Sequence, residues 1–150
     1  MKELPCLPLE VLLAEIPSDT PESAAKPQAL VVDDDPVFLA TTTEILEVNH
    51  YEVVASSDAR RALSHLEETA FDCMVTDLYM PHESGLWLVE HALAVRPDLA
   101  VVLMSGGSKR DLDRSSPDWL FVAKPFSSTE LLEAVASAMA TRRAGVAAGR

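Results

Sequence analysis

The stretch "LVVDDDPVF", residues 30–38, places Asp33, Asp34 and Asp35 directly behind a short apolar run and directly before Pro36. A short unbroken apolar run is typical of a strand that is buried on both faces of a parallel sheet. Adjacent carboxylates repel one another, so three of them at the end of a strand need a physical reason. Pro36 supplies one for Asp35, which is predicted to cap a helix with proline at its first position. Asp33 and Asp34 need a different physical reason.

The same order of apolar run and helical segment repeats along the chain. The runs "ALVV", "YEVVA", "DCMVT", "AVVLM" and "LFVA" predict five strands. Apolar residues at helical spacing predict helices near residues 36–48, 58–69, 84–95, 108–115 and 128–142. Ser127 and Glu130 form a capping-box pattern before the last of these. Strands that alternate with helices predict an α/β fold, a parallel sheet covered on both faces.

Polar residues follow four of these predicted strands, and the carboxyl ends of parallel strands meet at one edge of a sheet. These residues are Asp33 and Asp34, Asp77, Ser105 and Lys124. We therefore expect them to be neighbours in space. Clustered carboxylates are costly unless a cation neutralises them. Because no Cys or His belongs to the pattern, the ligand set favours Mg²⁺, or Mn²⁺, over zinc.

Four motifs, "VVDDDP", "VTDLYMP", "MSGG" and "AKPF", occur in this order within residues 28–141. Together they resemble the receiver domain of two-component response regulators. The resemblance implies a flavodoxin-like (βα)5 three-layer sandwich whose parallel five-stranded sheet has the order 2-1-3-4-5. It also implies a cis peptide between Lys124 and Pro125, which is reasonable because X–Pro bonds accept the cis form at low cost.

The resemblance also assigns roles to individual residues. It implies that Asp77 is the phosphoacceptor, and that Ser105 and Lys124 contact the phosphoryl group. The implied metal ligands are Asp33, Asp34, Asp77 and the main-chain carbonyl of Tyr79. Ser105 and Phe121 stand at the positions that switch conformation in this family.

The implied function is a phosphoacceptor that takes a phosphoryl group from a histidine kinase or a phosphotransfer protein and then controls a partner protein. Such a domain catalyses its own phosphorylation and dephosphorylation in the cytoplasm, and some receivers form homodimers. One alternative is the terminal receiver of a hybrid histidine kinase, because "ELPCLPLE" before a proline-rich linker resembles the end of a kinase ATP-binding domain. Another is a pseudo-receiver that binds partners without phosphorylation. A haloacid-dehalogenase-type phosphatase would need a second Asp at position 79, which is Tyr79.

Composition excludes several classes of protein. A net charge of −12 argues against a nucleic-acid-binding surface, which needs clustered Lys and Arg. No apolar run approaches the roughly 20 residues of a membrane-spanning helix. Cys6 and Cys73 do not make a disulfide framework, and Cys73 is predicted to be a small buried hydrophobe.

The flanks are predicted from composition alone. Residues 1–27 form a proline-rich extension, and residues 142–150 form a tail that is expected to be frayed. Leu9, Leu12, Leu13 and Ile16 share one face of a short helix within the extension. We expect this helix to dock on the receiver near Trp87, on a second copy or on a partner; a passive tail is the alternative.

Three local features carry structural predictions. Gly85 is expected where the backbone turns tightly into a helix. His50 stands where glycine commonly ends a helix, and Asn49 is expected to take the left-handed conformation instead. His82 and His91 are expected to be ordinary surface histidines.

Overall fold

A computed structural model describes residues 26–106 and 120–147 of the chain, with side chains as far as residue 142. Its sheet has five parallel strands in the order β2-β1-β3-β4-β5, as predicted. The strands are β1 (Gln28–Val32), β2 (Glu52–Ser56), β3 (Cys73–Asp77), β4 (Ala100–Ser105) and β5 (Leu120–Ala123). The described helices are α2 (Pro36–Val48), α3 (Ala59–Glu68), α4 (Gly85–Val95) and α6 (Ser128–Ala147). This is the flavodoxin-like arrangement.

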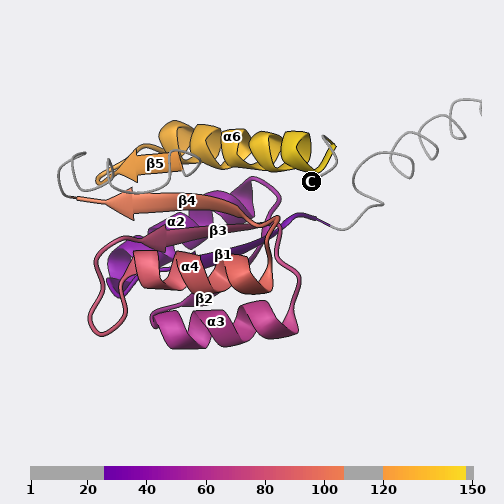
Figure 1. Cartoon of the computed structure of the whole chain (residues 1–150). Coiled ribbons are helices and arrows are strands. Elements are labelled where there is room, and N and C mark those ends of the chain that lie inside the picture. Colours follow the sequence, from indigo (N-terminus) through magenta and orange to yellow (C-terminus); the bar gives the residue numbers. More distant parts are fainter. Residues whose placement is uncertain (1–25, 107–119, 148–150) are drawn as a thin grey trace, which may run out of the picture.

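The helices cover the sheet in two layers, α3 and α4 on one face and α2 and α6 on the other (Figure 1). Successive strand residues point to opposite faces. In β1, Leu30 and Val32 join the core under α3 and α4, whereas Ala29 and Val31 join the core under α2 and α6. Both faces of the central strands are therefore buried, which explains why these strands read as continuous apolar runs.

Cys73 lies in β3 with no exposed surface, as predicted. Burial is the main cause that raises the pKa of its thiol to about 12. The thiolate is the reactive form of cysteine, so Cys73 is an inert core residue.

Side-chain caps fix where the helices begin. The Asp58 carboxylate caps α3 by accepting a hydrogen bond from the Arg60 amide, and the Ser84 hydroxyl accepts one from the Trp87 amide at the start of α4. The predicted capping box is present before α6, since Ser127 and Glu130 each accept a hydrogen bond from the other's amide. Each cap satisfies an amide that has no partner within its helix.

The predicted end of α2 is wrong in one detail. His50, not Asn49, takes the left-handed conformation, with a φ of 74°. Asn49 keeps a φ of −103°, and its side-chain amide donates to the Ile45 carbonyl at 2.8 Å. The left-handed residue therefore comes one position later than predicted. The amides of His50 and Tyr51 donate to the main-chain carbonyls of Glu47 and Leu46, which is the pattern of a Schellman cap.

The last helix is also longer than predicted. It runs to Ala147, so residues 142–147 belong to α6 and not to a frayed tail. Alanine and arginine are strong helix formers, which favours this continuation. The half-buried Arg142 guanidinium also lies 3.6 Å from carboxylate oxygens of both Asp72 and Asp98, which holds the helix against the sheet.

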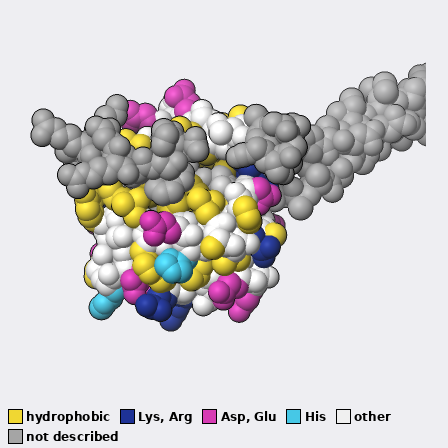
Figure 2. All heavy atoms as spheres, in the orientation of Figure 1, with side chains coloured by type: hydrophobic (Ala, Val, Ile, Leu, Met, Phe, Trp, Pro, Cys, Tyr) yellow, Lys and Arg dark blue, Asp and Glu magenta, His cyan; other side chains and the backbone are white. Residues whose placement is uncertain are grey.

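Two predictions fall outside the described residues: the docking helix that carries Leu9, Leu12, Leu13 and Ile16, and the helix near 108–115. Within the described part of the chain, no helix is long and apolar enough to cross a membrane. On the face that Figure 2 shows, the described Lys and Arg side chains lie apart among acidic ones and form no basic patch.

Candidate functional site

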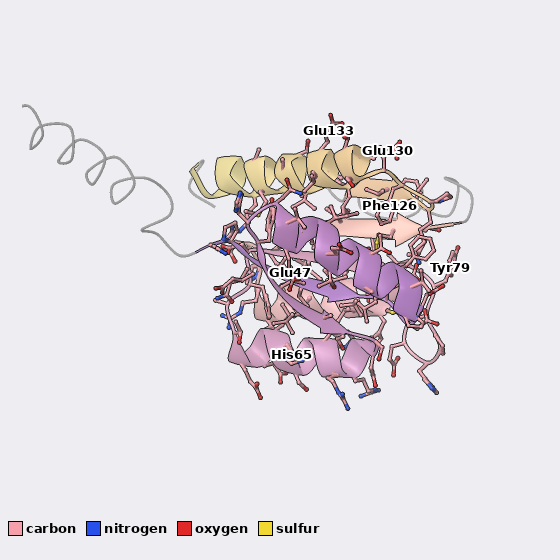
Figure 3. All side chains as sticks on the ribbon, turned by 180° about the vertical axis from the view of Figure 1, so that it is seen from behind. Glu47, His65, Tyr79, Phe126, Glu130 and Glu133 are labelled. Atoms are coloured by element: carbon pink, nitrogen blue, oxygen red, sulfur yellow. The ribbon has the colours of Figure 1, made fainter. Side chains whose placement is uncertain are left out.

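The predicted site residues lie at the carboxyl end of the sheet. Asp33 follows β1, Asp77 ends β3, Ser105 ends β4, and Lys124 follows β5. Strand register brings them level, since Asp77 pairs with Met104 and Ser105 with Ala123. Tyr79 and Phe126 lie at the same end of the molecule (Figure 3).

Three carboxylates gather at this edge. Oxygens of Asp33, Asp34 and Asp77 all lie within 4.8 Å of one another; Asp33 and Asp77 are buried, and Asp34 is exposed. Oxygen-only donors on two buried acids and one exposed acid match the preference of a hard divalent cation, and the exposed side leaves room for water ligands. The cluster could therefore hold a metal ion.

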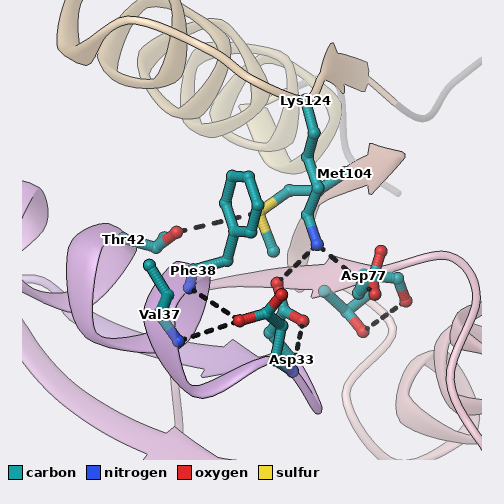
Figure 4. Close-up of polar contacts among 9 residues, drawn as sticks. Asp33, Val37, Phe38, Thr42, Asp77, Met104 and Lys124 are labelled. Atoms are coloured by element: carbon teal, nitrogen blue, oxygen red, sulfur yellow. Dashed lines mark hydrogen bonds and ion pairs between the residues drawn. The ribbon is translucent and has the colours of Figure 1, made fainter. Parts of the chain in front are cut away.

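Among the described residues, Lys124 places a positive charge against the cluster. Its ammonium lies 2.8 Å from Asp33 Oδ2 and 3.4 Å from Asp77 Oδ2 (Figure 4). Its side chain is 11% exposed, so solvent screens these ion pairs only weakly. Within the described part of the chain, one ammonium is thus shared between two carboxylates of a three-carboxylate cluster.

Asp77 shows the electrostatic effect of this crowding. Burial, and next the neighbouring Asp33 carboxylate, raise the pKa of Asp77 from 3.8 to about 6, and Asp34 adds to the rise. The Lys124 ammonium opposes the rise without cancelling it. A buried carboxylate with a perturbed pKa beside a cationic group is a candidate functional group.

Asp35 has the structural role that was predicted. Its Oδ1 accepts hydrogen bonds from the amides of Val37 at 2.9 Å and Phe38 at 3.4 Å, which caps α2. The Asp35 amide donates in turn to Asp33 Oδ1 at 2.9 Å. In the "DDDP" stretch, two acids therefore belong to the carboxylate cluster, and the third caps the start of α2.

The other predicted residues differ in exposure. Ser105 is fully buried, and its main-chain carbonyl accepts a hydrogen bond from the Lys124 amide at 2.8 Å. Phe121 is half-buried in β5, opposite Leu103. Tyr79 is 55% exposed at the rim of the site. The Lys124–Pro125 peptide is cis, as the resemblance implied.

Gly85 is required by a close approach of two backbone segments. A Cβ at this position would overlap the main-chain carbonyl oxygen of Asp77. The Gly85 amide donates to the Leu78 carbonyl at 2.8 Å, which closes the turn from the site into α4. The predicted tight turn is present, and it supports the segment directly after Asp77.

Two aromatic residues beside Lys124 were missed by the sequence analysis. The Lys124 ammonium lies 4.3 Å from the centroid of the Phe38 ring, and Phe38 in turn packs against Phe126 with ring centroids 6.1 Å apart. One turn along the same helix face, Thr42 Oγ1 is 3.9 Å from Met104 Sδ. The i, i+4 spacing places Phe38 and Thr42 on one face of α2, but no local pattern in the sequence shows that this face looks toward Lys124.

In the part of the chain that the structure describes, Trp87, His91 and His82 show no contact that would give them a role beyond the surface. The half-buried Trp87 ring stacks on His91 at 4.1 Å, and the Arg60 guanidinium lies over it at 5.2 Å. His91 is exposed, with Nδ1 2.8 Å from the Trp87 carbonyl oxygen. His82 is exposed in the loop after Asp77, with a φ of 71°. Trp87 is thus a partly exposed aromatic that already has partners within the domain.

Comparison with known proteins agrees with this geometry. A family model described as the response regulator receiver domain matches residues 29–136. The putative two-component response regulator ARR21 of Arabidopsis thaliana is 32% identical over 126 residues, 82% of this chain and 21% of that protein. The transcriptional regulatory protein PrrA of Mycobacterium leprae is 33% identical over 125 residues, 80% of this chain and 53% of that protein.

A solved structure gives the same result. The crystal structure of a response regulator receiver protein from Sinorhizobium medicae WSM419 superposes with a TM-score of 0.73 at 26% identity, covering 78% of this chain and 97% of that one. This chain spans 21% and 53% of the two curated relatives, so the likeness concerns one domain of each. The chain belongs to the response regulator receiver domain family.

Proposed function

We propose that this receiver domain accepts a phosphoryl group on Asp77 in a Mg²⁺-dependent reaction and thereby controls a partner protein. The observation that carries the proposal is the convergence of Asp77 with Asp33, Asp34 and Lys124 at one edge of the sheet. Asp77 is the member of the cluster that ends the middle strand, and it faces the ammonium that can neutralise an incoming phosphoryl group.

The transfer itself is a substitution at phosphorus. An Asp77 carboxylate oxygen forms a bond to phosphorus, and the bond from phosphorus to the donor nitrogen or oxygen breaks, the donor keeping the electron pair. No proton needs to leave Asp77, provided that it is ionised. The transition state spreads charge over the equatorial oxygens, so positioning and charge neutralisation supply the catalysis. Lys124 can provide both from its place beside Asp77 Oδ2.

The cluster fits Mg²⁺ by the chemistry of its donors. We propose Asp33, Asp34, Asp77 and the Tyr79 main-chain carbonyl as its protein ligands. When bound, the ion would neutralise charge between the carboxylate and the phosphoryl oxygens. Burial is the first cause of the raised pKa of Asp77, and the second is the neighbouring Asp33 carboxylate, whose negative charge a bound cation would offset.

The output of the reaction is a change of shape. A phosphoryl group on Asp77 adds negative charge and new acceptor oxygens directly beside the end of β4. We propose that the Ser105 hydroxyl turns toward this group and that the half-buried Phe121 ring moves with it. A local change of charge would thus shift an equilibrium between two conformations of the β4–β5 edge.

The proposed phosphoryl donor is a histidine kinase or a phosphotransfer protein in the cytoplasm, and the proposed target is another protein, with neither nucleic acid nor a membrane as a partner. A homodimer is one arrangement in which the switch could act. The domain serves either an independent regulator or, as the alternative, a hybrid histidine kinase. Both use the same Asp77 chemistry, and the full open reading frame distinguishes them.

The decisive experiment is chemical phosphorylation. The chain is incubated with acetyl phosphate and Mg²⁺, and its intact mass is measured. We expect a mass increase of one phosphoryl group that is sensitive to hydroxylamine and is absent when a chelator is added. Asp77→Asn should abolish the increase. Asp35→Asn is the matched control, because asparagine also caps helices and Asp35 lies outside the cluster.

The results distinguish phosphorylation of Asp77 from phosphorylation of another residue and from a pseudo-receiver. Labelling of the wild type and of Asp35→Asn, but not of Asp77→Asn, supports the proposal. Unchanged labelling of Asp77→Asn would place the acceptor elsewhere. A folded wild type that takes no label at any Mg²⁺ concentration would be a pseudo-receiver, an interaction module without this chemistry.

A further inference from the structure

The Lys124 ammonium contacts an aromatic ring as well as the carboxylates of Asp33 and Asp77. Its ammonium lies over the Phe38 ring, 4.3 Å from the centroid, on the far side from Asp77 (Figure 4). Phe38 is half-buried, and the Lys124 side chain is only 11% exposed. An aromatic face attracts an ammonium by its negative electrostatic potential, and this attraction is larger where water is excluded.

The Phe38 ring is itself held in place from two sides. The main-chain amide of Phe38 donates to the Asp35 carboxylate that caps α2. Its ring packs against Phe126, in the segment that follows Lys124. The "DDDPVF" stretch therefore brings together the acids, the cap and the aromatic face within one turn of chain.

This arrangement resolves a conflict within the site. Asp33 Oδ2 pairs with Lys124 at 2.8 Å, yet Asp33 is also a proposed ligand of the cation. When a divalent ion takes that oxygen, the ammonium loses its nearest partner and meets a second positive charge. An aromatic face offers a favourable place to the ammonium that uses no carboxylate oxygen, and it leaves the ammonium near Asp77.

We propose that Phe38 is a positioning residue that holds the Lys124 ammonium by a cation–π contact and so frees Asp33 for the divalent cation. The inference rests on the proposed function, which it deepens by adding a residue that tunes the affinity of the site for metal. Phe38 touches neither the phosphoryl group nor the cation, and it acts through Lys124.

The test compares three variants. Phe38→Leu removes the aromatic face and keeps an apolar side chain, whereas Phe38→Tyr keeps the face. Phe126→Leu is the control for lost aromatic packing, because the Phe126 ring packs against Phe38 in a tilted arrangement with centroids 6.1 Å apart, and leucine keeps an apolar side chain there. For each variant, Mg²⁺ affinity is measured by calorimetry without a phosphodonor, and acetyl phosphate labelling is measured across Mg²⁺ concentrations. A small donor excludes any effect of Phe38 on docking of a protein donor.

We expect Phe38→Leu to raise the Mg²⁺ dissociation constant roughly three- to tenfold, within the range that cation–π contacts span in proteins. The Mg²⁺ concentration that gives half-maximal labelling should rise by the same factor. Phe38→Tyr and Phe126→Leu should both stay within about twofold of the wild type. An unchanged Phe38→Leu variant would overturn the inference, and so would equal losses in Phe38→Leu and in either of the other two.

A second measurement needs no stable variant. In the wild type, the ring current of Phe38 should shift the NMR signals of the Lys124 side-chain methylene next to the ammonium upfield, with or without Mg²⁺. Signals at ordinary positions would overturn the inference. Failure of the proposed function is distinguishable, because a chain that takes no label on Asp77 would still show the upfield shift and the Mg²⁺ affinities.

Discussion

Asp77 combines two properties that conflict at the scale of a single residue. In the proposed function it must be ionised to attack phosphorus, yet it is 7% exposed and lies beside two other acids. Its pKa of about 6 records the unfavourable free energy of this charge in the metal-free protein. The proposed chemistry needs this charge, and in the proposed function a bound cation would offset its unfavourable free energy.

This cost predicts a pH-dependent gain from neutralising the residue. Because the pKa of Asp77 rises from 3.8 to about 6 on folding, the folded state keeps a proton that the unfolded state has lost between these values. The contribution of Asp77 to stability is therefore present below about pH 4 and is lost as the pH rises through about 6. Metal-free Asp77→Asn should match the wild type near pH 4 and exceed its unfolding free energy by roughly 1–3 kcal/mol above pH 7.

Urea unfolding at a series of pH values, in the presence of a chelator, measures this difference. Titrating groups that do not interact with Asp77 cancel when the two curves are subtracted, so the difference reports Asp77 together with its coupling to Asp33, Asp34 and Lys124. A difference that does not change between pH 4 and pH 8 would show that Asp77 is not destabilised by its charge.

At the scale of elements, the turn after α2 carries a residue in an unfavourable conformation. His50 has a φ of 74°, a region in which a side chain with a Cβ is strained by about 1 kcal/mol. Glycine adopts this conformation without that strain. His50→Gly should therefore stabilise the domain by roughly 0.5–1 kcal/mol in thermal or urea unfolding.

Asn49→Gly is the matched control for this prediction. Asn49 has a φ of −103°, and its side chain donates to the Ile45 carbonyl, so glycine there removes a hydrogen bond and relieves no strain. Asn49→Gly should be neutral or destabilising. Equal effects of the two substitutions would mean that the turn does not store strain at His50.

The same turn shows what a sequence can predict. Apolar runs and helical periods predicted the alternating strands and helices, and cap residues before two helices predicted the caps at Asp35 and Ser127. One topological rule then predicted the meeting of Asp33, Asp77 and Lys124. The strand order was predicted only from the resemblance to receiver domains. The choice between Asn49 and His50 accompanies hydrogen bonds to the carbonyls of Ile45, Glu47 and Leu46, which no sequence pattern encodes.

Contacts between distant segments were also beyond the sequence. The Phe38 ring meets Lys124 only because α2 and the segment after β5 lie at the same edge of the sheet. The continuation of α6 is supported by Arg142, whose acidic partners Asp72 and Asp98 are far from it in the chain. Such pairs become visible only once the elements are placed in space.

At the scale of the whole molecule, the carboxylate cluster lies in a chain with a net charge of −12 and a pI of about 4.6. A net charge of this size destabilises the compact state through general repulsion. Monovalent salt screens such repulsion over about 10 Å at 0.1 M. A divalent ion can act in the same general way, or it can bind the cluster and stabilise the folded state by mass action. These two effects must be separated before any stabilisation is assigned to the site.

Asp34→Ala separates them. Asp34 is the exposed member of the cluster, so removing it relieves repulsion within the site and deletes one proposed ligand while leaving the buried core intact. Without metal, the variant should be as stable as the wild type or up to about 1 kcal/mol more stable.

Added KCl should raise the melting temperature of both proteins alike. Millimolar Mg²⁺ at constant ionic strength should raise the melting temperature of the wild type by more than that of Asp34→Ala. If Mg²⁺ stabilises both equally, it acts by screening and not through the cluster, and a strongly destabilised metal-free Asp34→Ala would make Asp34 a structural residue.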